Sequence, residues 1–204
     1  MKESNPTVDL WAIERECAAE GWQAVCGVDE AGAGPLAGDV YAAAVILPPD
    51  YELPYLNDSK KLTEKRREML FPLIHEQAVS WAVATASAAE IDELNILNAR
   101  MLAMRRAIEA LDPPADFALI DGNRNRGIPL PNRMVVQGDS LSASIAAASI
   151  LAKVSRDHYM VEMAQKYPDY RFEKHKGYPT KLHYDLLRQY GPCPIHRRSF
   201  LKKL

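Results

Sequence analysis

The sequence predicts an α/β protein in which helices flank a mixed, five-stranded sheet and a small helical appendage forms the C-terminus. Three observations lead to this class. Short runs rich in small and β-branched residues alternate with longer runs of helical periodicity. No internal repeat or low-complexity linker interrupts them. The 204 residues, 48% of them hydrophobic, are enough for one sizeable core.

The strand-like runs cover residues 24–28, 40–47, 79–86, 117–120 and 134–136. A glycine-rich turn joins the first two. Helical runs are expected at residues 10–20, at 63–77 with Thr63 as the N-cap, and at 142–163. One long helix should begin at the capping box of Ser87 and Glu90 and stop before Pro113 and Pro114. This order of elements favours a mixed sheet covered by helices.

Charge is unevenly distributed along the chain, although the net charge is only -2. Residues 171–204 hold nine Lys or Arg against two acids, a local balance of +7, which leaves -9 for residues 1–170. The basic end indicates either a polyanionic partner such as a nucleic acid or a solvated tail, and charge alone does not choose between them.

Membrane insertion and export are not expected from this sequence. The N-terminus has no apolar signal region, and the longest apolar run, residues 40–49, is far shorter than the roughly 20 residues of a membrane-spanning helix. Cys17, Cys26 and Cys193 form no CxxC pair. Scattered cysteines favour reduced, structural thiols, so we expect a cytoplasmic protein without zinc or disulfides.

Acidic residues follow three of the strand-like runs. Asp29 ends the first, Asp121 ends the run at 117–120, and Asp139 lies just after the run at 134–136 and before a helix. Side chains at strand ends of α/β sheets converge on a crevice at the carboxyl edge, so these residues and Glu30 are expected to share one site. Each aspartate taken alone is also a common turn or N-cap residue.

Four carboxylates in one crevice would repel one another unless cations enter. Ligands that are all oxygen favour Mg²⁺ or Mn²⁺ over zinc, and the five histidines show no HxxH or HExxH spacing. Two such ions can activate water and stabilise the leaving oxygen in phosphodiester cleavage. We therefore expect a two-ion site and a nucleic-acid substrate.

Seven stretches in order carry a family resemblance: GVDEAGAGPLAG (27–38), LNDSKKL (56–62), IDELNI (91–96), LIDGNR (119–124), GDSLSASIAAASILAKVSRD (138–157), HKGYPT (175–180) and HRRSF (196–200). Together they make the chain similar to bacterial type 2 ribonuclease H, ribonuclease HII, over residues 24–200. The resemblance implies a ribonuclease H-like catalytic domain, residues 1–165, and a basic helical substrate-binding appendage, residues 166–204. It further implies a monomer that cleaves the RNA strand of RNA–DNA hybrids and cuts 5′ of ribonucleotides embedded in duplex DNA.

The resemblance also assigns roles to individual residues. By motif, the metal-binding and catalytic carboxylates are Asp29, Glu30, Asp121 and Asp139. Main-chain groups of the glycine turn, at Gly32, Ala33 and Gly34, are implied to read the ribose 2′-hydroxyl, which only RNA offers. Tyr178 is implied to pack on the deoxyribose that follows the ribonucleotide, and Ser59, Lys60 and Lys61 to lie near backbone phosphates. Tyr178 and Lys61 also have an ordinary reading, as an exposed aromatic and an exposed lysine.

One position departs from the family pattern, because Ala33 stands where the family has the arginine of Gly-Arg-Gly. An arginine there would hold a phosphate next to the scissile bond through two parallel hydrogen bonds, which alanine cannot do. We expect the fold and metal site to be preserved, and substrate binding or ribonucleotide discrimination to be weaker.

Three other assignments fit the sequence less well. Residues 32–37 fit the loose GxGxxG/A pattern of a dinucleotide-binding oxidoreductase, but that motif must open a helix, whereas residues 40–47 look like a strand. A nucleic-acid-binding domain without catalysis would keep the basic surface but has no need of four carboxylates. Ribonuclease HIII carries an additional N-terminal domain, and only about two dozen residues precede the first predicted strand.

Overall fold

A computed structural model describes residues 8–51 and 62–201. At its centre is a mixed five-stranded sheet of order β3-β2-β1-β4-β5, with bounds β1 Val25–Ala31, β2 Val40–Ile46, β3 Ser80–Ala86, β4 Phe117–Asp121 and β5 Asn132–Val135. β1, β2 and β3 are antiparallel neighbours, whereas β4 pairs parallel to β1 and β5 parallel to β4. The predicted fold class, with its mixed five-stranded sheet flanked by helices, is confirmed.

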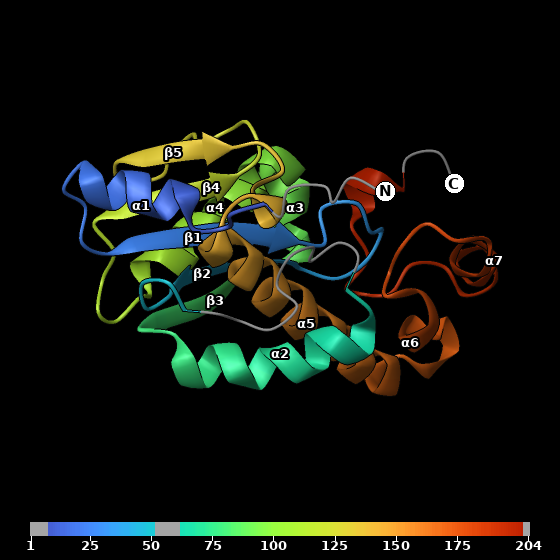
Figure 1. Ribbon diagram of the computed structural model, residues 1–204. Helices are drawn as coiled ribbons and strands as arrows, with labels where there is room; N and C mark the ends of the chain where they lie inside the picture. The colour runs from blue at the N-terminus through green and yellow to red at the C-terminus, as the bar shows by residue number, and fades with distance from the viewer. Residues whose placement is uncertain (1–7, 52–61, 202–204) are drawn as a thin grey trace, which may run out of the picture.

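Helices cover both faces of the sheet (Figure 1). Their bounds are α1 Ala12–Ala19, α2 Glu64–Gln77, α3 Ala88–Leu94, α4 Ile96–Glu109, α5 Ala143–Lys166, α6 Phe172–His175 and α7 Lys181–Tyr190. Alternate residues of β2 explain the two layers, because Ala43 and Val45 pack in one core cluster with α5, whereas Ala42 and Ala44 pack in another with α4. Strand periodicity thus places one hydrophobic core on each side of the sheet.

Small residues let α5 approach the sheet closely. A Cβ atom at Gly27 would lie 2.0 Å from the main-chain carbon of Ser144, so only glycine permits this contact. The carboxylate of Glu14 accepts hydrogen bonds from the N–H and the Oγ of Ser144 and, at 2.6 Å, from the Oγ of Ser142. An anion is favoured at a helix N-terminus, so α1 stabilises the start of α5.

The predicted long helix after Ser87 is wrong in one respect. Its capping box is present, with Ser87 accepting from the N–H of Glu90 and Glu90 accepting from the N–H of Ser87. The helix, however, is interrupted at Asn95, where φ is 66°. The Asn95 side chain accepts from the N–H groups of Leu97 and Asn98 and so begins α4. A side-chain cap inside the periodic run divided it into α3 and α4.

The C-terminal segment lies beyond the ends of β1 and β5 to which their arrowheads point (Figure 1). It has its own core cluster, in which Tyr170, Phe172 and Leu187 pack with Leu36 and Met160. Leu36 belongs to the glycine turn and Met160 to α5, so this cluster joins the segment to the rest of the chain. The division into residues 1–165 and 166–204 stays a prediction.

Three buried histidines in this segment are held as neutral rings. The Nδ1 of His183 lies 3.0 Å from the Tyr178 carbonyl oxygen and therefore carries its proton. Its Nε2 then accepts from the Nε2 of His196 at 3.0 Å. The Nδ1 of His196 accepts from the N–H of Cys193 at 2.9 Å. His175 is fixed in the same way, donating to one main-chain carbonyl oxygen and accepting from one N–H.

Cys17, Cys26 and Cys193 are unpaired and buried, as predicted. Within the part of the chain that the structure describes, no helix is both long and apolar enough to cross a membrane.

We predict that acid destabilises the protein by protonating the buried histidines of the C-terminal segment. Burial lowers the pKa of His183 and of His196 to about 4. The unfolded chain therefore binds protons between about pH 6.5 and 4 that the folded chain does not, and stability falls as pH falls through this interval. Each histidine should cost on the order of 3 kcal/mol, measured by urea unfolding at a series of pH values.

The control is His158→Gln, which removes an exposed histidine paired with Glu68. It should leave the acid sensitivity unchanged. A free energy of unfolding that stays constant from pH 7 to 4.5 would contradict the prediction.

Candidate active site

Asp29 and Glu30 lie in β1 beyond the point where this strand stops pairing with β4. The parallel pairing ends at Val28 with Ile120, whereas the antiparallel pairing with β2 continues to Ala31. The prediction that the strand ends at Val28 was therefore too short, because β2 still supplies hydrogen bonds. Asp29 emerges beside the end of β4 on a backbone that β2 holds in place.

The other two predicted carboxylates reach the same edge of the sheet. Asp121 is the last residue of β4, and its Oδ1 accepts the N–H of Gly138 at 2.7 Å. This hydrogen bond links the end of β4 to the 3₁₀ turn Gly138–Ser140, which contains the buried Asp139 and leads into α5. The position of Asp139 thus depends on a contact between β4 and the turn.

The four carboxylates are close enough to perturb one another. Burial raises the pKa of Asp29 well above its usual range, and the charges of Glu30, Asp121 and Asp139 raise it further. The main-chain N–H of Glu30, 2.7 Å from Asp29 Oδ1, opposes the shift. This is the convergence at one sheet edge that the strand ends predicted; the role of these residues as ligands stays a prediction.

Glu30 faces away from Asp29, because successive side chains of a strand point to opposite faces. It forms an ion pair with Arg100 of α4. Burial raises the pKa of Glu30, Arg100 lowers it, and Asp121 raises it again. Arg100 could not be predicted from the sequence, since nothing in its spacing along α4 indicates a carboxylate partner.

A cleft of about 330 Å³ brings together five of the predicted site residues, whereas Asp121, Ala33 and Gly34 do not line it. Its lining consists of Asp29, Glu30, Ala31, Gly32, Arg67, Asp139, Ser149, Lys153 and Tyr178. The ring centroid of Tyr178 lies 5.9 Å from Lys153 Nζ and 5.8 Å from the Arg156 guanidinium. Acidic, basic, aromatic and main-chain groups therefore surround one space, a combination suited to a phosphodiester and its sugar.

The donor set fits a hard divalent cation by its chemistry, since carboxylate oxygen is the ligand that Mg²⁺ and Mn²⁺ prefer. Among residues 8–51 and 62–201, however, no three His, Cys, Asp or Glu side chains are placed to bind one ion together. The ion pair with Arg100 engages Oε1 of Glu30, whereas Oε2 is buried without a hydrogen-bond partner among the described residues.

The turn between β1 and β2, residues 32–39, which we call the glycine loop, needs glycine at one of the two predicted positions. Gly32 has φ of 94°, and a Cβ atom there would lie 2.0 Å from the Nε of Arg156. A Cβ atom at Gly34 would meet nothing within 4 Å, so packing gives no reason for glycine there. The loop leads into β2 and not into a helix, which removes the dinucleotide-binding alternative. Ser59, Lys60 and Lys61 lie outside the described residues.

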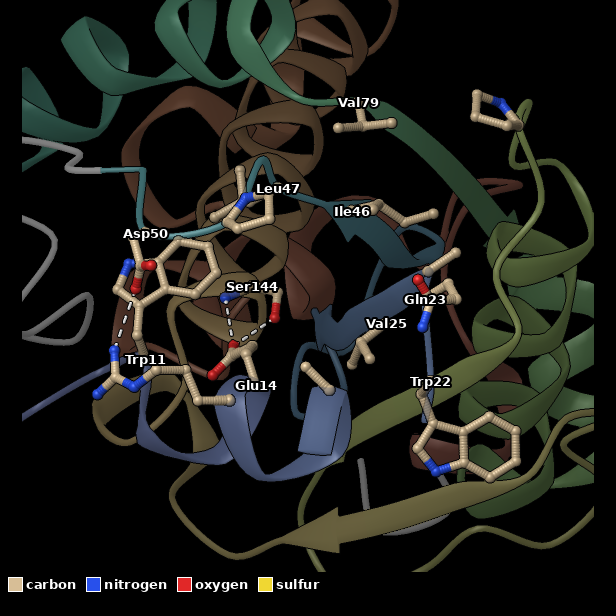
Figure 2. Close-up of a pocket in the computed structure, with 15 residues that line it drawn as sticks. Trp11, Glu14, Trp22, Gln23, Val25, Ile46, Leu47, Asp50, Val79 and Ser144 are labelled. Carbon is tan, nitrogen blue, oxygen red and sulfur yellow. Dashed lines mark hydrogen bonds and ion pairs between the residues drawn. The ribbon is translucent and has the colours of Figure 1, made fainter. Parts of the chain in front are cut away.

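A second cavity, of about 190 Å³, lies near the start of β1 (Figure 2). Trp11, Trp22 and Leu47 contribute apolar walls, and Glu14 is held there by Ser144. It contains none of the predicted site residues. We therefore place the candidate site at the edge of the sheet where the carboxylates meet.

We predict that Asp29→Asn preserves or raises stability when divalent ions are chelated. The folded-state pKa of Asp29 lies above the unfolded value, so ionisation opposes folding, and stability falls as pH rises through the interval between the two values. Removing the charge should therefore raise the free energy of unfolding at pH 7.5, measured by urea unfolding in EDTA.

Asp92→Asn serves as the control of opposite sign. Asp92 accepts hydrogen bonds from the N–H groups of Arg198 and Ser199, so its neutralisation should lower stability. If Asp29→Asn destabilised the protein as much as Asp92→Asn, carboxylate repulsion would not be the dominant effect.

The chain is similar to known proteins of one family over most of its length. A family model described as Ribonuclease HII matches residues 26–203. The Ribonuclease HII of Syntrophotalea carbinolica is 49% identical over 202 residues, covering 98% of this chain and 97% of the relative. The crystal structure of the ribonuclease H2 from Pyrococcus horikoshii OT3 has a TM-score of 0.71 and 26% identity, covering 87% of this chain and 93% of that one.

A third comparison shows the fold alone. The crystal structure of Bst-RNase HIII in complex with Mn²⁺ has a TM-score of 0.62 and 17% identity, and it covers 94% of this chain and 69% of that one. The match of the family model to residues 26–203 and the relative at 49% identity support assignment to ribonuclease HII. The chain belongs to the ribonuclease HII family, and it is a ribonuclease H.

Proposed function

We propose that this protein hydrolyses the RNA strand of RNA–DNA hybrids and cuts 5′ of ribonucleotides embedded in duplex DNA, leaving 3′-hydroxyl and 5′-phosphate ends. The observation that supports the proposal is the cleft, whose lining includes Asp29, Glu30 and Asp139 together with Gly32 and Tyr178. A substrate in this cleft would bring its phosphate to the carboxylates and its sugars to the loop and the ring.

In this proposal Asp29, Glu30, Asp121 and Asp139 hold two Mg²⁺ or Mn²⁺ ions. When bound, such ions supply a hydroxide nucleophile and neutralise charge on the leaving oxygen. The rigid placement of Asp29 by β2, and of Asp139 by the bond between Asp121 and Gly138, fixes the donors relative to the scissile phosphate.

Basic residues of the cleft would bind the substrate backbone. Lys153 pairs with Asp157 at 2.7 Å and still borders the cleft, as Arg67 does. Cations of this kind supply affinity without sequence preference, which suits an enzyme that must act at any sequence. Ser59, Lys60 and Lys61 are proposed to extend this contact. The protein is proposed to act as a cytoplasmic monomer.

Tyr178 is proposed to recognise the deoxyribose next to the ribonucleotide. The residue is 39% exposed, and the Arg156 and Lys153 cations lie near its ring. A flat aromatic surface held at the cleft provides a platform for a sugar, and contact with the sugar on the DNA side would favour RNA-to-DNA junctions.

We predict that Asp29→Asn abolishes cleavage while the fold is retained. Loss of a charge at the reacting phosphate should lower kcat by roughly 10²–10³-fold or more, measured with a labelled hybrid and with a duplex carrying one ribonucleotide, in Mg²⁺ and in Mn²⁺.

The matched control is Glu109→Gln, which removes an exposed carboxylate paired with Arg105 on α4. It should keep the parental rate. Cleavage by Asp29→Asn at the parental rate would show that the site is wrongly assigned. A parent protein that binds the duplex but never cuts it would favour the binding-domain alternative.

We predict that Ala33→Arg raises activity. Ala33 is half-buried beside the cleft residue Gly32. A guanidinium there adds charge-assisted hydrogen bonds to phosphate, which should raise kcat/KM on the embedded-ribonucleotide duplex about tenfold or more. Ala33→Lys, which adds charge without the planar fork, should give a smaller gain. Unchanged kcat/KM and unchanged selectivity in Ala33→Arg would refute the idea that Ala33 weakens the site.

A further inference from the structure

The glycine loop is held from beneath by a fully buried arginine of the C-terminal segment. The Nη2 of Arg197 donates to the Gly32 carbonyl oxygen at 2.6 Å, and its Nη1 donates to those of Ala33 at 3.1 Å and Pro35 at 2.8 Å. Its Nε donates to the Gly38 carbonyl oxygen at 2.8 Å. One guanidinium therefore binds four carbonyl oxygens of the loop.

A second buried arginine joins the same loop to the segment that carries the tyrosine. The Nε and Nη2 of Arg156 donate to the carbonyl oxygens of Asp39, at 3.2 Å, and Ala37, at 3.1 Å. Its Nη1 donates to the Lys176 carbonyl oxygen at 3.1 Å, two residues before Tyr178. The loop and the tyrosine are thereby fixed relative to each other.

These guanidinium groups are buried at a cost. Neither forms a salt bridge with a carboxylate among the described residues, and burial lowers the pKa of Arg197 to about 9. Carbonyl dipoles replace the missing counter-charge. Apolar side chains packed against the loop would carry a smaller desolvation penalty than buried guanidinium groups. What the guanidinium groups add is hydrogen bonding, which orients the loop backbone.

The orientation has a direct geometric consequence. In a trans peptide the C=O of one residue and the N–H of the next point in opposite directions. Because the carbonyls of Gly32 and Ala33 turn inward to Arg197, the N–H groups of Ala33 and Gly34 turn away from it. Within the described chain, neither N–H donates to a protein acceptor, and the space beside Gly34 is open.

We propose that Arg197, assisted by Arg156, is a positioning residue that presents the Ala33 and Gly34 N–H groups to the substrate and so sets selectivity for a ribonucleotide. The inference rests on the proposed function, because it assigns these donors to oxygen atoms of the ribose and its phosphate. Paired main-chain N–H groups form a concave site for such acceptors.

The test is Arg197→Lys, which keeps the charge but loses the fork that four carbonyls require. Cleavage is compared on two duplexes, one with a single ribonucleotide and one with its 2′-fluoro analogue. The ratio of their kcat/KM values should fall tenfold or more, while Mn²⁺ affinity measured by calorimetry stays within twofold of the parent. An unchanged ratio would overturn the inference.

The matched control is Arg106→Lys. Arg106 donates to the Thr85 carbonyl oxygen at 2.8 Å and pairs with Glu90, away from the residues that line the cleft. It should lower stability without changing the ratio. An equal fall of the ratio in this variant would show that loss of stability alone explains the effect, and would also overturn the inference.

A readout independent of catalysis separates the inference from the proposed function. The amide signals of Ala33 and Gly34 in ¹⁵N spectra should move or broaden in Arg197→Lys and remain in place in Arg106→Lys. If the parent cuts no substrate, the proposed function fails and these signals still decide the role of Arg197. If Arg197→Lys does not fold, Arg156→Lys takes its place, and unmoved signals there count against the inference.

Discussion

Two buried guanidinium groups beneath the glycine loop are the interaction on which the candidate site most depends. Arg197 comes from the far end of the chain, and Arg156 from the long helix α5. Five of the loop's eight residues are glycine or alanine, whose side chains form no hydrogen bonds, and its main chain is also bonded to Gly177, Ile195 and Arg197. Its shape is therefore imposed by donors that lie more than 100 residues away in sequence, and an intact C-terminal segment is a condition for an ordered cleft.

The same region keeps neighbouring residues in different charge states. His196 is held neutral by Cys193 and His183, whereas the adjacent Arg197 stays charged among carbonyl oxygens. An isolated bridge between Ala37 and His196 sets the two side by side with the loop. Neutral histidines avoid adding positive charge next to a guanidinium that already lacks an acidic partner. The buried histidines are therefore electrostatically compatible with Arg156 and Arg197, the two arginines that clamp the loop.

At the sheet edge the electrostatics are unfavourable, in contrast to the histidine and arginine region. Four carboxylates lie close together there, although their mutual repulsion opposes folding. Burial and mutual repulsion raise the pKa of Asp29, and the fold tolerates this because β2, the Gly138 turn and the α5 N-terminus are each held by separate contacts. Glu14 has a part in this, since it stabilises the start of the helix that follows Asp139. Such local conflict within an otherwise consistent fold is typical of functional sites.

Much of the fold and of the candidate site can be predicted from the sequence alone. Hydrophobic periodicity identified the strands and most helices, and carboxylates at strand ends predicted their meeting at one edge, because these patterns depend on neighbours within a few residues. Tertiary structure alone decided the interruption at Asn95, the pairing of Glu30 with Arg100, and the clamp of Arg156 and Arg197. The partners of a buried charge are set by the tertiary fold. Contacts between residues as distant in sequence as Gly32 and Arg197 produce no periodic pattern from which they could be predicted.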